Sequence, residues 1–286
     1  MTNSEFSDTF TTLLNSFNTQ ARFGEQASKQ EIVLDEYEKS VLLTQAQDII
    51  IKSYFDGTSN AQGQGFDDST RRQMDFSSLI KIAELSEATS GSAFDERGIV
   101  YQLPRKKSSS GTELSGTTDV LFILNEKLTA KTVTSVSEGT VVYNNGGKGK
   151  EYVIVPINYK EYDREMSKPY AQPLKKQAWR LFQNQVTGFD INTELIPRWN
   201  VKKKGTSSSP AVGDVYFFYK VRYVKRPRPI ILEDLPDELE IDGEQKASSC
   251  ELNPIIHMDI LNKAVELAVN TRGGGSSQEP NRSNNR

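Results

Sequence analysis

Residues 216–232 have the sequence Tyr-Phe-Phe-Tyr-Lys-Val-Arg-Tyr-Val-Lys-Arg-Pro-Arg-Pro-Ile-Ile-Leu, and this stretch decides the fold. Side chains along a strand alternate between two faces, and here one face is apolar from residue 215 to residue 223. The other face begins with aromatic residues and becomes basic. Pro227 and Pro229 lack the N–H that a sheet ladder needs, so the strand ends before them. We therefore predict a half-buried edge strand with one face on the core; its interleaved aromatic and basic residues also resemble a platform for nucleic acid.

Helices are predicted on both sides of this strand. Apolar residues recur at helical spacing in residues 4–17, 35–55, 67–84 and 253–272. Asp35, followed three residues later by Glu38, predicts a reciprocal cap at the start of the second helix. Asn253 and Pro254 are typical of the start of the last helix, because proline is favoured at the first helical position.

The middle of the chain has the two-residue period of strands. We predict strands over 99–103, 120–124, 132–134, 140–143, 151–157 and 189–197, a short helix over 158–167 and a compact segment over 175–181. The predicted fold class is α+β. It has an N-terminal helical region (1–90), a β-rich region with an antiparallel sheet (91–243), a C-terminal helix packing back on the helical region (244–271) and a disordered tail (272–286).

The composition limits the function classes. The chain has 286 residues, enough for one large domain or two small ones, and 36% of them are apolar. This fraction is low for a globular domain, so we expect either an extended fold or a surface that is covered only in an assembly. The net charge of −3 predicts no overall attraction to nucleic acid or to an anionic membrane. No signal peptide or membrane-spanning stretch is expected.

The scarcity of His and Cys argues against common catalytic devices. One Cys, Cys250, and one His, His257, cannot build a Cys/His zinc site. We interpret His257 as a structural residue with a local hydrogen bond. Residues 146–150, Gly-Gly-Lys-Gly-Lys, lack the spacing of a phosphate-binding loop and fit a hairpin tip. The sequence thus predicts no enzyme activity, no cofactor and no metal.

Exposed cations and one aromatic residue are the candidate contacts to other molecules. Two basic loop tips, Arg105-Lys106-Lys107 and Lys202-Lys203-Lys204, are either solvated loop ends or phosphate contacts. Arg71 and Arg72 fit a solvated helix face or an acidic partner. The candidate interface residues are Tyr37, Arg71, Arg72, Lys202, Lys203, Lys204, Arg222, Lys225, Arg226 and Arg228. A nucleic-acid-binding protein of packaging or replication is the main alternative to a structural protein, and a tail-associated hydrolase is a third hypothesis.

Three segments resemble a structural protein of the crAss-like tailed phages. They are residues 34–41 (Leu-Asp-Glu-Tyr-Glu-Lys-Ser-Val) with the helix up to Tyr54, residues 222–232 with 239–243, and residues 250–257 (Cys-Glu-Leu-Asn-Pro-Ile-Ile-His) with the helix up to Ala268. The resemblance implies a virion protein that serves as a ring or adaptor subunit of the neck between portal and tail. Such proteins form cyclic, usually twelve-fold rings around the DNA channel, and the resemblance brings no catalytic residues.

This family would give the chain three kinds of partner: its own copies, the portal and neighbouring ring or tail proteins, with DNA passing through. The composition of the chain agrees with such a family. A low apolar fraction suits a subunit that completes its burial against neighbours, through contacts that close into a ring. A mildly acidic chain suits a channel wall that DNA passes without sticking.

Overall fold

The structure is a computed structural model that describes residues 1–20, 33–55, 70–85, 98–107, 113–137, 140–143, 149–168, 173–174, 176–184, 191–197, 212–236 and 238–273. The chain divides into two compact units. The first combines Met1–Leu79 with Pro227–Arg286, and the second is Ile80–Arg226. The two units are described in turn.

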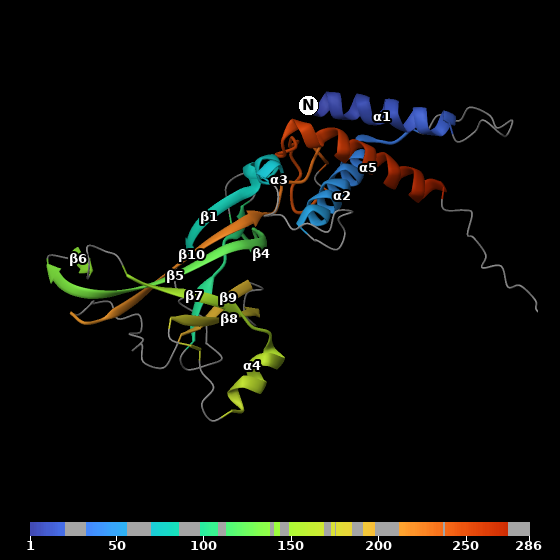
Figure 1. The fold of residues 1–286 in the computed structure, drawn as a ribbon. Helices are drawn as coiled ribbons and strands as arrows, with labels where there is room; N and C mark the ends of the chain where they lie inside the picture. The colour runs from blue at the N-terminus through green and yellow to red at the C-terminus, as the bar shows by residue number, and fades with distance from the viewer. Residues whose placement is uncertain are drawn as a thin grey trace, which may run out of the picture. The chain divides into compact units, whose positions relative to one another are not determined.

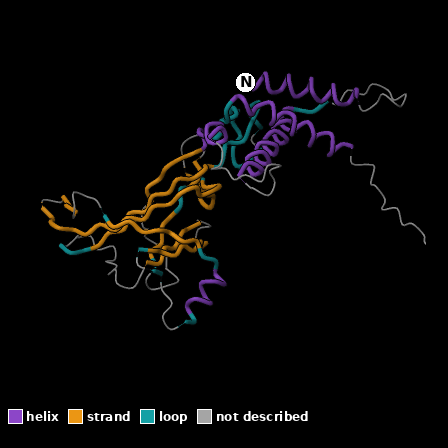
Figure 2. The backbone as a smooth tube through the Cα atoms, in the orientation of Figure 1, coloured by secondary structure: helices purple, strands orange, loops and turns teal. Residues whose placement is uncertain are grey.

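The first unit is helical (Figures 1 and 2). Its elements are α1 (Asn3–Gln20), α2 (Glu36–Phe55), the short α3 (Thr70–Asp75), a 3-10 turn (Ser77–Leu79) and α5 (Pro254–Gly273). Helix α5 packs against both α1 and α2. Because apolar residues recur at helical spacing, each long helix buries one face. The fully buried side chains include Phe6, Phe10, Leu43, Ile51, Ile260 and Leu261.

The predicted starts of α2 and α5 are confirmed. A carboxylate oxygen of Asp35 accepts a 2.7 Å hydrogen bond from the backbone N–H of Glu38. The side-chain oxygen of Asn253 accepts a bond of 3.2 Å from the N–H of Ile255, and Pro254 occupies the first helical position. None of the helices in the described ranges combines the length and apolar character needed to cross a membrane.

The predicted third helix is wrong beyond its first turns. Helix α3 ends at Asp75, and residues 80–85 form strand β1 (Ile80–Leu85). This strand pairs with β10 (Val215–Lys225) over six residue pairs. The side chain of Phe76, directly after α3, is fully buried against the rings of Tyr54 and Phe55. Strand pairing thus overrides a helix-compatible sequence here.

The second unit contains an eight-stranded sheet in the order β1-β10-β5-β7-β8-β9-β2, with β6 added to β5 (Figure 1). All its pairings are antiparallel except β7 with β8. The bounds are β2 Ile99–Gln102, β5 Val120–Ser137, β6 Thr140–Tyr143, β7 Lys150–Pro156, β8 Gln177–Asn184, β9 Ile191–Pro197 and β10 Val215–Lys225. A separate hairpin pairs β3 (Arg105–Lys107) with β4 (Glu113–Thr118).

Four sequence predictions are corrected in this unit. Strand β10 is an interior strand between β1 and β5, where we expected an edge strand. The two strands predicted over 120–124 and 132–134 are one strand of 18 residues, β5. Residues 177–184 form a strand within the segment expected to be compact. Residues 105–107 pair as a strand, and Lys106 is buried, where a basic loop was expected.

The alternation predicted for β10 is confirmed. Tyr219, Val221 and Tyr223 face the main core, together with residues from β1, β2, β5, β8 and β9. Strands β2 and β10 lie far apart in the strand order, yet the rings of Tyr101 and Tyr219 are 5.1 Å apart. The sheet therefore curls around this core.

Helix α4 (Tyr159–Met166) covers the opposite face of part of the sheet. Asn158 and Glu161 form a capping box that starts the helix. The buried ring of Tyr162 packs edge-on against Trp179 of β8, in a second cluster with Leu181 and Ile196. The outer face of β8 and β9 is thus buried.

Candidate assembly surfaces

The predicted interface residues of β10 are at the surface of the second unit. Arg222 is exposed on the face of β10 away from the core. Lys225 is half-buried at the end of the strand. Arg226 is exposed, and its N–H donates a 2.7 Å hydrogen bond to the carbonyl of Asp119.

The other predicted residues are placed elsewhere or lie outside the described residues. Tyr37 is half-buried in the first turn of α2. Arg228 is half-buried in the first unit, 3.9 Å from a carboxylate oxygen of Glu251. Arg71 and Arg72 lie in α3, but their side chains are outside the described part of the structure, as are Lys202, Lys203 and Lys204 altogether.

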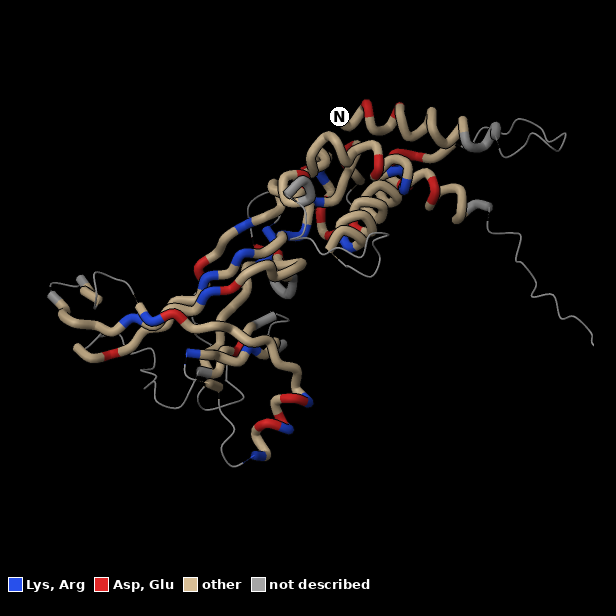
Figure 3. Tube along the Cα trace, in the orientation of Figure 1, with Lys and Arg blue, Asp and Glu red and all other residues tan. Residues whose placement is uncertain are grey.

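The outer face of β1, β10 and β5 has a mixed row of charges that sequence reasoning missed. Register places Glu84 beside Lys220 and Lys220 beside Lys127. Lys220 binds Glu84 at 2.9 Å, and Lys127 binds Glu151 of β7 at 2.5 Å. Figure 3 shows basic and acidic positions interleaved along these strands. Only the strand register brings these residues together, so no local motif could have identified them.

An aromatic cluster adjoins this row. Lys131 of β5 lies 4.6 Å from the ring centre of Phe218 and 5.5 Å from that of Tyr143. The rings of Tyr143 and Phe218 are 5.6 Å apart, and Tyr216 is 6.4 Å from Tyr143. The cation and the rings attract one another, which holds this end of the face in place.

Within the first unit, α2 binds an extended segment through three buried polar side chains. Ser40 accepts from the N–H of Leu232 (3.0 Å), and Thr44 accepts from the N–H of Ile230 (3.1 Å). Gln47 donates to the carbonyl of Arg228 (2.9 Å). We call these contacts the α2 ladder. Spacings of four and three residues keep its three side chains on one helix face, opposite alternate residues of the segment.

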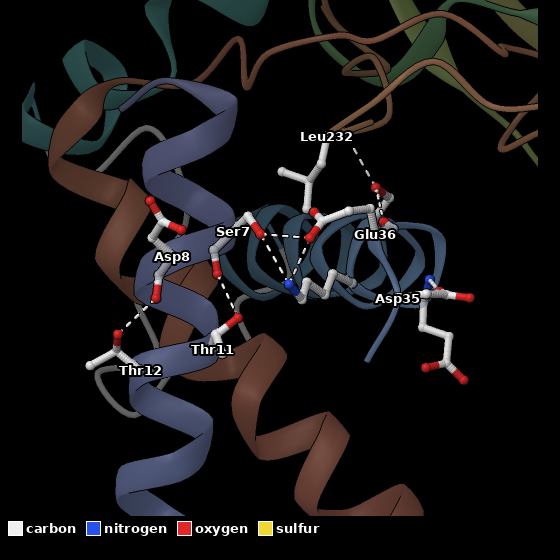
Figure 4. A network of polar contacts seen from close by, with 10 residues as sticks. Ser7, Asp8, Thr11, Thr12, Asp35, Glu36 and Leu232 are labelled. Atoms are coloured by element: carbon white, nitrogen blue, oxygen red, sulfur yellow. Dashed lines mark hydrogen bonds and ion pairs between the residues drawn. The ribbon is translucent and has the colours of Figure 1, made fainter. Parts of the chain in front are cut away.

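The other edge of this segment is also paired. Ile231 and Ser248 exchange backbone hydrogen bonds of 3.1 and 2.9 Å, and Asn3 of α1 donates to the carbonyl of Ile231. A neighbouring polar cluster links α1 to α2. Ser7 donates to Glu36, and the buried Lys39 contacts both (Figure 4). Pro227 and Pro229 lack the N–H that a sheet ladder needs, and along this edge of the segment the side chains of α2 take the place of a neighbouring strand.

An acidic loop follows this segment. Residues 233–243 contain no Lys or Arg. Its described carboxylates, all of them on exposed residues, are Glu233, Asp234, Glu238, Glu240 and Asp242. Hydrogen bonds from Leu235 to Gln245 and between Ile241 and Glu244 fix the loop backbone. The acidic loop is therefore an ordered, negatively charged surface.

A hollow in each unit is lined by described residues. In the second unit, a cavity of about 570 Å³ lies where β5 and β7 separate, and it is lined by Glu126 and Arg180. These two side chains, each 11% exposed, form an ion pair of 2.8 Å, and Tyr219 donates to Glu126. Burial, followed by the Glu126 carboxylate, raises the pKa of Tyr219. In the first unit, a groove of about 600 Å³ between α2 and α5 is lined by Ile50, Tyr54 and Val269 among others.

His257 and Cys250 have structural surroundings. The ring Nε2 of His257 lies 3.1 Å from the carbonyl of Leu252, which confirms the expected local hydrogen bond, and burial lowers the pKa of this histidine. Cys250 donates to Gln47, and burial raises the pKa of its thiol to about 11. Among the described residues, no three or more His, Cys, Asp or Glu side chains are grouped so that they could hold a metal ion.

Comparison with known proteins identifies the family. The profile of a family described as phage tail ring protein 3/4 matches residues 1–280. The chain is 39% identical over 269 residues to Ring protein 4/5 of Bacteroides phage crAss001, covering 92% of this chain and 90% of that protein. It is 32% identical over 273 residues to Ring protein 3 of the same phage, covering 94% and 95%. The chain therefore belongs to the phage tail ring protein 3/4 family of the crAss-like phages.

Proposed function

We propose that this chain is a non-catalytic structural subunit of a closed ring in the phage virion, at the neck or upper tail, around the path of the DNA. The observation that carries the proposal is the family match over residues 1–280, with two ring proteins of one phage as relatives along nearly their whole length. A ring of about twelve copies would match the usual symmetry around a portal. The partners are then its own copies, the portal or adjacent rings, and transiently DNA.

The presence of two relatives in one phage supports a stacked arrangement. Ring protein 4/5 and Ring protein 3 are both similar to this chain over nearly its whole length. Rings built from similar subunits present similar upper and lower surfaces, so one ring can stack on another. We propose that the exposed cations Arg222 and Arg226 belong to contacts between neighbouring subunits.

Quantitative mass spectrometry of purified particles tests this proposal, with the portal protein as the internal standard. About one copy per portal subunit, or a small multiple, is the expected result for one or a few rings. Absence from the virion contradicts the proposal, and a far higher ratio points to the capsid shell. Cryo-microscopy of the neck then locates the ring and counts its subunits.

A further inference from the structure

The outer face of β1, β10 and β5 has more positive than negative charge. It has four cations, Lys127, Lys131, Lys220 and Arg222, and two carboxylates, Glu84 and Glu151. Each carboxylate already binds one of the lysines, which leaves Lys131 and Arg222 without a carboxylate partner among the described residues. The face therefore has two cations available to an acidic partner.

This face is also unusually apolar for a solvated sheet surface. Ile82, beside Arg222 in the register, is 66% exposed, and Val153 of β7 is 64% exposed. The rings of Phe218, Tyr216 and Tyr143 are half-buried at one end. Exposed apolar side chains among charges are typical of a protein interface, whereas phosphate groups gain nothing from apolar side chains.

The acidic loop of the first unit has the complementary properties. Within the described part of the chain, no ion pair forms with the carboxylates of Glu233, Glu238 or Glu240. Leu239, between the last two, is 37% exposed and supplies an apolar contact. The hydrogen bonds that fix the loop backbone reduce the entropy that binding would cost.

We propose that the outer face of β1, β10 and β5 binds the acidic loop, residues 233–243, of a second copy of this chain. This inference rests on the proposed ring. A cyclic ring needs two different surfaces on each subunit, so that each copy offers one surface to the preceding copy and the other to the next. The acidic loop and the outer face are two such surfaces with opposite charge, and opposite charge also fixes the register of the contact.

Charge reversal on the full-length chain tests the contact, with assembly measured by analytical ultracentrifugation over a concentration series. The first variant combines Lys131→Glu with Arg222→Glu on the outer face. The second combines Glu238→Lys with Glu240→Lys on the acidic loop, where the exposed side chains leave folding unchanged. Each variant should weaken assembly roughly tenfold or more. The control matched to the first variant, Lys52→Glu with Lys160→Glu, makes the same charge change at exposed positions outside both surfaces and should assemble as the wild type does.

The chain with all four reversals distinguishes a direct contact from a general charge effect. Since the two reversed positions of each outer face can then pair with the two reversed positions of a loop, assembly should be at least about threefold stronger than in either two-residue variant. Normal assembly of either two-residue variant overturns the inference, and so does a four-residue variant that stays dissociated. Loss of DNA binding in the first variant, with assembly unchanged, assigns the face to nucleic acid and also overturns it.

A cysteine cross-link shows whether the contact joins two copies. Starting from Cys250→Ser, one chain receives Arg222→Cys and a second chain, extended by a tag, receives Glu240→Cys. Oxidation of the mixture should give a covalent pair of one untagged and one tagged chain, and absence of this pair overturns the inference. If the protein forms a ring in the virion but the cross-linked pair is absent, only the proposed contact between the outer face and the acidic loop is wrong. If the protein is absent from the virion, the proposed function is wrong.

Discussion

The α2 ladder makes a sharp prediction at Thr44. Substitution Thr44→Val keeps the shape of the side chain but removes the hydroxyl that accepts from the N–H of Ile230 at 3.1 Å and donates to its carbonyl at 3.4 Å. Thr44 is 7% exposed and Ile230 is fully buried, so water cannot replace the lost partner. The variant leaves a buried backbone donor unpaired.

Two opposing contributions determine how much Thr44→Val changes the free energy of unfolding. A buried unsatisfied N–H costs about 1–3 kcal/mol. The added methyl group returns up to about 0.8 kcal/mol through burial of apolar surface. The carbonyl contact is long and contributes little. We expect Thr44→Val to reduce the free energy of unfolding by about 1–2 kcal/mol.

The control is Thr11→Val in α1. The hydroxyl of Thr11 donates to the carbonyl of Ser7, one helical turn earlier. The helix offers that carbonyl a backbone partner as well, so the same substitution should change stability by less than about 0.5 kcal/mol. The pair therefore separates the lost ladder contact from the effect of a Thr→Val change in a helix.

Urea unfolding followed by helical circular dichroism measures both variants, because α1, α2 and α5 belong to one unit. Amide hydrogen exchange adds a local readout. The N–H of Ile230 should exchange faster in Thr44→Val, while the N–H of Leu232, which donates to Ser40, should change less. Equal stability of the Thr44 and Thr11 variants, with unchanged exchange at Ile230, would refute the view that the ladder holds this segment.

Three further predictions concern single residues. Asp35→Ala should lower the free energy of unfolding in urea by about 1 kcal/mol, because it removes the oxygen that accepts from the N–H of Glu38 and caps α2. Asp35→Asn can still cap the helix and should lower it by only a few tenths of a kcal/mol, so equal losses in the two variants would contradict the cap. The pKa of His257 is lowered from 6.5 by burial, so protonation favours the unfolded chain, and stability should fall as pH decreases below about 6.5. His257→Gln should flatten that fall, and an unchanged pH profile would show that this residue does not cause it. Gly149→Ala places a methyl carbon 2.4 Å from the backbone carbonyl oxygen of Ala130 and should cost about 1–3 kcal/mol, measured by tryptophan fluorescence; a stability equal to that of the wild type would contradict this close approach.

The local features of this fold could be predicted from the sequence because each depends on neighbouring residues. The caps at Asp35 and Asn253 and the alternation of β10 all follow from short patterns that one element satisfies by itself. The capping pair of α4, Asn158 and Glu161, is also local, although it was not singled out from the sequence. A pattern fixes an element when the relevant contacts lie within a few residues.

The position of each strand in the sheet could not be predicted in the same way. The strand β10 was expected at an edge because two prolines follow it, yet the prolines come after its last residue, Lys225, and leave both of its edges available. Strand β1 pairs with β10 across more than a hundred residues of chain. Its sequence, Ile-Lys-Ile-Ala-Glu-Leu, is compatible with a helix, and only this distant partner decides for a strand.

The net charge of the chain is a poor guide to its surfaces for the same reason. A total of −3 suggests a weak, uniform field, but the acidic loop and the outer face differ in their local charge. The acidic loop concentrates carboxylates within 11 consecutive residues that contain no Lys or Arg, so it is visible in the sequence. The cations of the outer face come from three strands and meet only through their register. A subunit that joins identical copies through opposite charges must have both surfaces, and their charges offset each other in part in the total. A small net charge is therefore compatible with surfaces that have a strong local charge.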